Sequence, residues 1–395
     1  MKKLLLILFI ATSLNSFAQR IAGSEIYYER TGNRAYKITA VVYRSCDSDP
    51  LNSINMYVFA SNLSQNVSMT RQSIEKINDN CGNPCNFINA NGNAGFERHT
   101  YTGSINFNQS PYNGFISNSY CTVYVAIRQG GRDNRTTTQG TGMYYNEASI
   151  NICDSTISNS SPRFSMEPKF YASINHALSY SPGPTDADED DSLAFSIEPV
   201  LSNHNTNITY NSGYSYTTPI TPYCPPNAGY TGCKALPNAR PPRGFYFDAG
   251  TCTIITTPTD TDLAYIRLKI TEFRKINQVW KAMGSVSRDF LIQPKYNPYN
   301  NPPYFVTSPL SPDLNLCSES YSFDITAKDD PYLPNQTSAD STKLFYDMGY
   351  GASEFKVYNN GIEQSARLTL KGDTSSTIKT RYVTIGAYDK QCNIG

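Results

Sequence analysis

The sequence predicts an all-β exported protein made of three tandem β-sandwich domains. Three observations lead to this prediction: the composition, short stretches of alternating apolar and polar residues, and an internal repeat. Of the 395 residues, 30 are tyrosine and only 17% are charged, whereas about 25% is usual in soluble globular domains. Abundant Tyr with low charge is typical of β-sheet outside the cytoplasm and argues against a helix-rich cytosolic enzyme.

The charge balance bears on the partners. Basic and acidic residues are equal in number, 33 of each. Nucleic acids and anionic membrane surfaces select proteins with an excess of Lys and Arg. We therefore expect no nucleic-acid partner. Intrinsic disorder is also disfavoured, because aromatic and aliphatic residues recur along the whole chain.

Residues 1–18 have the pattern of a secretory signal peptide. Two lysines precede an apolar run, residues 4–11, and the small residue Ala18 precedes the expected cleavage before Gln19. The run is too short to cross about 30 Å of hydrocarbon as an anchor. No later segment of the sequence has the length and apolarity of a membrane span, so we expect the mature chain to leave the cytoplasm without one.

Two segments at a fixed offset suggest an internal repeat. Each contains Pro-x-Phe, with Pro162 and Pro303 lying 141 positions apart, and an acidic stretch follows each at the same distance, beginning at Thr185 and Thr326. Proline favours an extended entry and the aromatic residue can close the end of a sandwich, so each segment marks the start of a β-domain. We therefore divide the mature chain into three domains, at residues 19–162, 163–298 and 299–395.

The expected elements of these domains are short strands. No apolar period of 3.6 residues persists for three turns, so little helix is expected. Strand-like segments include residues 36–42, 121–127, 266–271 and 382–389. A turn at 31–33 precedes the first of them. Residues 245–254 contain two short strand-like runs on either side of a turn. The strand, turn and strand order near the end of the second block is typical of an immunoglobulin-like sandwich.

All ten cysteines lie in the exported part, where disulfides form and persist. Cys317 and Cys392 are the only candidates for each other in the third block, so we expect them to pair. The pairing of the other eight is open: Cys46, Cys81, Cys85, Cys121, Cys153, Cys224, Cys233 and Cys252. The first block holds five cysteines and the second three. These odd numbers imply either two free thiols or a disulfide across the boundary near Pro162, for which Cys153 is the nearest candidate on the first block's side. A metal site at Cys81 and Cys85 is disfavoured, because no second ligand pair accompanies them.

Several motifs resemble those of a known group of proteins. The first block contains GSEIYY at residues 23–28, YKIT at 36–39, VYRSC at 42–46 and ERHTYTG at 97–103, followed by YC at 120–121. With these motifs it resembles the opening of gliding-motility-associated or type IX-secreted surface proteins of gliding Gram-negative bacteria. This resemblance implies a surface or extracellular location.

The second block is similar to the cadherin-like or immunoglobulin-like modules of the same proteins. It carries DADEDDSL at residues 186–193 and FDAGT at 247–251, where the modules have D-x-D-x-D-S-L and F-D-x-x-T-G. The acidic stretch has one extra residue, Glu189 replaces a usual Gly, and Thr-Gly is inverted. Family members commonly end in a gliding-associated or sorting domain, and this chain stops at Gly395 after an expected last strand. We therefore expect either a fragment truncated at its C-terminus or a chain that uses another route from the periplasm, which keeps a periplasmic location open.

The acidic stretch is the candidate metal site. A loop tolerates such a density of carboxylates when they are solvated or bind a hard cation, and Ca²⁺ prefers oxygen ligands. Calcium is thus a candidate cofactor, and a solvated loop without an ion is the alternative. The candidate ligands are Asp186, Asp188, Glu189, Asp190 and Asp191, with a weaker counterpart in the third block at Asp329, Asp330 and Asp340.

We expect no catalytic residues and no enzyme. The three histidines, His99, His176 and His204, are far apart and lie in no metalloprotease or hydrolase motif, so structural or surface roles are expected. No carboxylate pair for glycoside hydrolysis is identifiable. Tyrosines such as Tyr296, Tyr299 and Tyr304 offer rigid apolar faces for sugars or proteins; the alternative is that they fill strand edges and linkers.

These observations predict a non-catalytic structural or adhesive protein of the cell envelope, associated with surface adhesion or gliding motility. The expected partner is an extracellular protein or glycan surface, contacted through loops and domain junctions. The alternative is an accessory carbohydrate-binding region of a secreted polysaccharide-degrading or proteolytic system.

Overall fold

The computed structural model of the chain describes thirteen stretches of residues, and the statements below concern these alone. They are 20–77, 95–133, 136–139, 142–153, 158–188, 191–225, 233–296, 301–306, 320–330, 341–346, 352–359, 361–371 and 383–389. The predicted signal peptide, residues 1–18, lies outside them. The predicted all-β class is confirmed: in the described ranges the one α-helix is the four-residue α2 (Gly114–Ser117).

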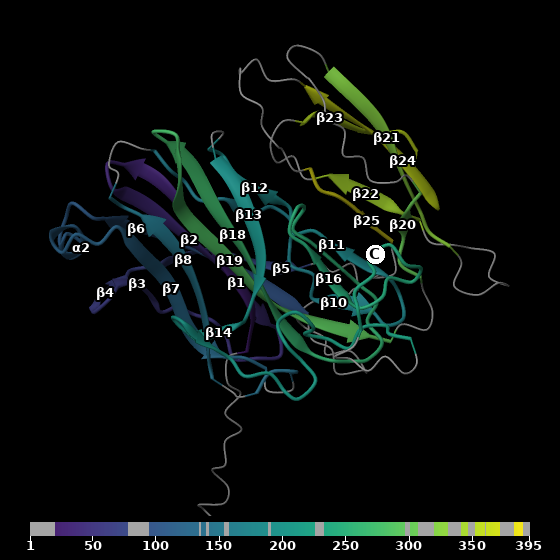
Figure 1. The fold of residues 1–395 in the computed structure, drawn as a ribbon, viewed down its shortest axis with the longest axis horizontal. Coiled ribbons are helices and arrows are strands. Elements are labelled where there is room, and N and C mark those ends of the chain that lie inside the picture. Colours follow the sequence, from purple (N-terminus) through teal and green to yellow (C-terminus); the bar gives the residue numbers. More distant parts are fainter. Residues whose placement is uncertain are drawn as a thin grey trace, which may run out of the picture.

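Twelve strands form the main sheet, seen at the left of Figure 1. Its main path runs β4-β3-β7-β8-β19-β1-β2-β6-β5. Of the other three strands, β18 and β10 pair with β19, and β13 pairs with β18. In the order of the path, followed by these three, the bounds are β4 (Leu63–Val67), β3 (Met56–Ala60), β7 (Thr122–Gly131), β8 (Met143–Asn151), β19 (Val279–Lys295), β1 (Ile21–Gly32), β2 (Ala35–Ser45), β6 (Phe96–Asn106), β5 (Thr70–Ile77), β18 (Ala264–Ile276), β13 (Asp191–Glu198) and β10 (Tyr171–Ser173).

Smaller sheets complete the fold. Three of them belong to the second block and two to the third, whose strands lie apart at the upper right of Figure 1. Those of the second block are β11 (Leu178–Tyr180), β17 (Thr253–Thr256) and β16 (Phe245–Asp248); β9 (Arg163–Phe164) and β12 (Pro184–Thr185); and β14 (Leu201–Asn203) and β15 (Thr206–Asn207). Those of the third block are β20 (Tyr304–Phe305), β21 (Ser320–Lys328), β24 (Glu363–Lys371) and β23 (Ala352–Val357); and β22 (Lys343–Tyr346) and β25 (Ile385–Tyr388).

The alternation of apolar and polar residues in the sequence corresponds to the buried and exposed faces of the strands. In β2 the side chains of Tyr36, Ile38, Ala40 and Val42 are all buried, because successive side chains of a strand point to opposite faces. A two-residue turn containing Arg34, which has φ 52°, joins β1 to β2 close to the predicted turn. The predicted strand, turn and strand at 245–254 is present as the hairpin of β16 and β17.

The main sheet crosses the boundary predicted near Pro162, so separate first and second domains are not confirmed. One edge of β19 pairs with β18 along most of its length, and the other edge meets β8, then β1, then β10. Phe290 of β19 lies opposite Gly23 of β1, and a Cβ atom at Gly23 would lie 2.7 Å from the carbonyl oxygen of Asp289. One hydrophobic core accordingly contains residues of both blocks. Local strand pattern could not reveal this, because the partners of β19 in the first block, β8 and β1, lie more than 130 residues earlier in the chain.

The two Pro-x-Phe segments form similar short strands at the start of the second and third blocks. β9 and β20, at the two Pro-x-Phe segments, are both two-residue strands that pair antiparallel with a later strand. Phe164 lies opposite Pro184, and Phe305 lies opposite Ala327, so the two pairings differ in register by two residues. A separate small core of alanines and a leucine joins the two sheets of the third block.

Two disulfides are described, and each stays within one block. Cys121 pairs with Cys153, and Cys224 with Cys233, so Cys153 does not make the cross-boundary bridge considered above. Cys46 is also disulfide-bonded, and Cys252 is a buried free thiol. The expected pair Cys317 and Cys392, like Cys81 and Cys85, lies outside the described residues. Disulfides are typical of extracytoplasmic proteins; in the described part of the chain, no helix has the length and apolarity needed to cross a membrane.

Candidate functional site

Three carboxylates from separate segments meet beside the main sheet. Asp186 directly follows β12, Asp191 begins β13, and Glu272 lies in β18. One oxygen of each lies within 4.8 Å of the others. We call these three residues the carboxylate cluster. The antiparallel pairing of β13 with β18 brings Asp191 close to Glu272, because Asp191 lies opposite Arg274, two residues further along β18.

Glu272 is the buried member of the cluster, with none of its surface exposed. Its Oε1 accepts hydrogen bonds from the Tyr28 hydroxyl and from Asn159 Nδ2, each at 2.5 Å, whereas its Oε2 is buried with no hydrogen-bond partner. Gly284 of β19 lies opposite Glu272 and leaves room for this arrangement: a Cβ there would lie 2.0 Å from the Tyr28 hydroxyl. A buried carboxylate oxygen without a partner is costly, unless a cation or a proton neutralises it.

Arg274 is the cation beside the cluster. Its guanidinium pairs with both oxygens of Asp191, at 2.5 and 2.7 Å, and lies 3.5 Å from Asp188 Oδ2. Asp188 Oδ2 also accepts the Ser160 backbone N–H at 2.6 Å. Asp186 accepts the Asp188 backbone N–H at 2.9 Å through Oδ1, and its Oδ2 is buried with no hydrogen-bond partner.

The cluster holds more negative charge than Arg274 can balance. With every group ionised, the three carboxylates and Asp188 would face one guanidinium, a net charge of −3. Burial, with the charges of Asp191 and Asp188 adding to it, raises the pKa of Asp186 to about 7. Burial and then the charge of Asp186 raise the pKa of Glu272 well above its ordinary value. Without a bound cation, the cluster therefore holds protons that ordinary carboxylates would release.

The predicted metal ligands are only partly brought together. Asp186 and Asp191 lie in the cluster, Asp188 lies beside it, and Glu189 and Asp190 fall outside the described residues. In the third block, Asp329 is buried and Asp330 pairs with Lys328 at 3.3 Å, while Asp340 lies outside the described residues. Within the ranges described, the structure brings no third acidic, His or Cys ligand to Asp329 and Asp330.

Glu272 was missed by the sequence reasoning, although a signal was present. Ile266, Leu268 and Ile270 are the buried residues of β18 that alternate with polar ones, and Glu272 occupies the next position on that same face. A carboxylate on the apolar face of a strand must have partners or lose its charge. That signal identifies an unusual position, but not the loop that supplies the other ligands.

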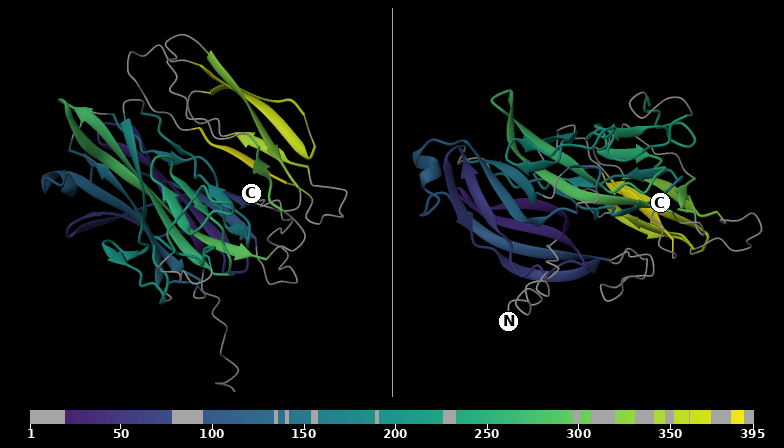
Figure 2. Two further views of the ribbon diagram at one scale, coloured as in Figure 1. Left: turned by 45° about the vertical axis from the view of Figure 1, so that its right-hand side comes forward. Right: turned by 90° about the horizontal axis from the view of Figure 1, so that it is seen from below.

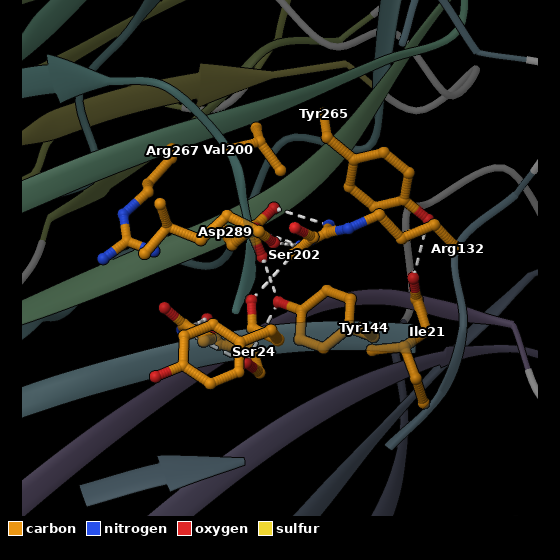
Figure 3. Close-up of polar contacts among 12 residues, drawn as sticks. Ile21, Ser24, Arg132, Tyr144, Val200, Ser202, Tyr265, Arg267 and Asp289 are labelled. Atoms are coloured by element: carbon orange, nitrogen blue, oxygen red, sulfur yellow. Dashed lines mark hydrogen bonds and ion pairs between the residues drawn. The ribbon is translucent and has the colours of Figure 1, made fainter. Parts of the chain in front are cut away.

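A second buried polar group links the first and second blocks (Figure 3). Arg132 donates to both oxygens of Asp289 at 3.2 and 2.7 Å, and the side chains of this pair are 1% and 0% exposed. The guanidinium lies between two aromatic rings, 4.4 Å from the centroid of Tyr144 and 4.6 Å from that of Tyr265. The hydroxyl of Tyr265 donates to the carbonyl of Ile21 at 2.7 Å. Each oxygen of the Asp289 carboxylate thus accepts a hydrogen bond from a residue of the other block.

A third group lies on the opposite face of β19, because Arg288 and Asp289 are adjacent in that strand. Arg288 Nη2 donates to both oxygens of Glu25 in β1, at 2.9 and 2.8 Å. Glu25 also accepts hydrogen bonds from the hydroxyls of Tyr27 and Tyr43. Ion pairs on both faces therefore join β19 to the first block.

These groups explain part of the tyrosine excess. Tyr27, Tyr28, Tyr43 and Tyr144 are buried, and the hydroxyl of each donates to a carboxylate, a serine hydroxyl or a backbone carbonyl of a polar group described above. Tyrosine fills apolar space and still provides a donor for a buried charge. A preference for β-structure alone therefore does not account for these residues.

The β18–β19 hairpin carries the chain's single tryptophan at its tip. Asn277 and Gln278, with φ of 49° and 65°, form the turn, and the next two residues, Val279 and Trp280, are 58% and 54% exposed. Lys275 lies opposite Trp280. In the right-hand view of Figure 2 the green hairpin extends beyond the neighbouring strands. We call residues 275–281 the hairpin tip.

The histidines do not converge. His99 is buried in β6 with Nε2 3.1 Å from Glu97, His204 lies 2.9 Å from Glu147, and burial lowers the pKa of His176. Of the tyrosines considered as contact residues, Tyr296 and Tyr304 are exposed and Tyr299 lies outside the described residues.

Comparison with known proteins adds no family. The chain matches no protein-family model and has no significant match among curated proteins.

Proposed function

We propose that the chain is a non-catalytic structural and adhesive protein of the cell envelope, exported and associated with surface adhesion or gliding motility. The observation that carries this proposal is the hairpin tip, where Trp280 and Val279 are exposed on a hairpin that projects from the main sheet. Trp is prominent among residues that dominate binding energy, and Trp280 lies next to a second exposed apolar residue, Val279.

The frame beneath the tip supports the same proposal. β19 is held by buried ion pairs on both faces, Arg288 with Glu25 and Asp289 with Arg132. A contact residue on a rigid element loses little conformational entropy on binding. The partner is an extracellular protein or glycan surface. Lys275 and Lys281, which flank Trp280, give the hairpin tip a positive charge for this contact.

An adhesion assay under flow tests this proposal. Beads coated with the mature chain are passed over protein-coated and polysaccharide-coated surfaces, and the retained fraction is counted. We expect retention above that of albumin-coated beads and a several-fold loss with Trp280→Ala. Tyr216→Ala is the matched control, because Tyr216 is also exposed but lies outside the hairpin tip.

Retention no better than albumin on every surface would contradict the proposal, as would equal retention of wild type and Trp280→Ala. Retention on polysaccharide alone would favour the accessory carbohydrate-binding alternative. Circular dichroism of both variants verifies that the fold is unchanged.

A further inference from the structure

We propose that the carboxylate cluster of Asp186, Asp191 and Glu272 is a binding site for one calcium ion. Two carboxylate oxygens there, Asp186 Oδ2 and Glu272 Oε2, are buried and accept no hydrogen bond. The second of these belongs to a side chain with no exposed surface, which distinguishes the cluster from an ordinary acidic loop.

The surroundings orient these oxygens. Tyr28 and Asn159 occupy Glu272 Oε1, and the Asp188 backbone N–H occupies Asp186 Oδ1. In both residues the hydrogen-bonded oxygen fixes the carboxylate while the other oxygen stays available. Asp191 differs, because Arg274 binds both of its oxygens, and a carboxylate oxygen has a further lone pair with which it can contact an ion. The single positive charge of Arg274 leaves the cluster negative.

The ligand chemistry favours calcium. All three candidate groups are carboxylates, which are hard oxygen ligands, and no sulfur or imidazole ligand belongs to the cluster. Oxygens bound at a Ca–O distance of about 2.3–2.6 Å can lie up to about 4.6–5.2 Å apart. One calcium ion can therefore contact an oxygen from each residue within the 4.8 Å that separates them. Calcium takes about six to eight oxygen ligands, and water and backbone carbonyls complete this number.

The position of the cluster gives the ion a structural role. Asp191 begins β13, Glu272 lies in β18 just before the hairpin tip, and Asp186 follows β12. Calcium would join these three segments at one point. Since the ion contacts no residue of the hairpin tip, this inference is independent of adhesion.

A calcium titration of the mature chain, with metal removed beforehand, tests the inference. Isothermal titration at pH 7.5 and thermal unfolding with increasing CaCl₂ are measured on wild type, Glu272→Gln and Asp260→Asn. We expect one ion per chain and an unfolding temperature that rises by several degrees as the site fills. Glu272→Gln should weaken binding at least tenfold, whereas Asp260→Asn, at an exposed acidic residue outside the cluster, should bind like wild type.

Glu272→Gln retains the shape of the protonated side chain, so the variant should fold, and circular dichroism verifies this. If it does not fold, Asp186→Asn serves in its place. The inference is overturned if wild type shows neither heat nor a thermal shift up to millimolar calcium, or if a folded cluster variant binds as tightly as wild type. Binding that Asp260→Asn weakens equally would also overturn it, because the ion would then respond to overall charge.

Discussion

Replacing Asp289 by Asn should destabilise the first and second blocks together. The change removes the negative charge that neutralises Arg132 but retains nearly the same shape. Arg132 would remain buried, with 1% of its side chain exposed, and would lose its charged partner. The contacts that it keeps are to uncharged groups, namely the carbonyls of Tyr145 and Leu201 and the two aromatic rings described above. Breaking a buried ion pair by removing one partner costs about 3–5 kcal/mol.

This cost is a large part of the stability of a domain, which is about 5–15 kcal/mol. With a urea dependence of about 3 kcal/mol per M, the unfolding midpoint should fall by about 1 M or more. Because β19 pairs with β1, β8 and β18, we expect a single transition for both blocks. Hydrogen exchange followed by peptide mass analysis would then show β2 and β18 losing protection together.

The matched control is Glu29→Gln in β1 of the main sheet, which disrupts the exposed pairs of Glu29 with Arg163 and Lys37. Its midpoint should scarcely change, because exposed pairs contribute little. A double variant, Arg132→Met with Asp289→Leu, should regain much of the loss, since no unpaired charge remains. The reasoning is refuted if Asp289→Asn lowers the midpoint no more than Glu29→Gln, or if β18 loses protection while β2 keeps it.

Two further predictions concern titration and thiol reactivity. Because the folded pKa of Asp186 is raised to about 7 and the ordinary value is near 4, the folded state binds the extra proton. With calcium removed, the stability contributed by this group should therefore fall as pH rises from about 4 to 7. In Asp186→Asn the unfolding temperature should decline less steeply over this pH range. The other charged or titratable groups that face Asp186 are unchanged in the variant: Asp188, Asp191, Glu272 and Arg274. Parallel curves of unfolding temperature against pH for the variant and wild type would contradict this. Cys252 has no exposed surface, and burial raises the pKa of its thiol to about 12. It should resist alkylation in the native protein and react in urea, as judged by peptide mapping, and rapid native labelling would show that the site opens.

The candidate site illustrates which information a sequence holds. The density of acidic residues at 186–191 directed attention to Asp186 and Asp191, two members of the carboxylate cluster, because that density depends on composition within one loop. The partner Glu272 is about 80 positions away and could be identified only as a polar residue on the apolar face of a strand. Which loop faces it depends on the pairing of β13 with β18.

By itself, the sequence determined the all-β class, the alternating strands and the hairpins, because side-chain alternation and turn residues act over a few positions. Tertiary structure alone decided that β19 joins the first block to the second. It also decided that Arg288 and Asp289, on opposite faces of β19, find their counterions Glu25 and Arg132 in the first block. The physical reason is the same in each case. A strand edge can hydrogen-bond with any other strand, and the pattern along one strand does not specify which partner it meets. That choice is made by the packing of the shared core and by the requirement that each buried charge meets its counterion.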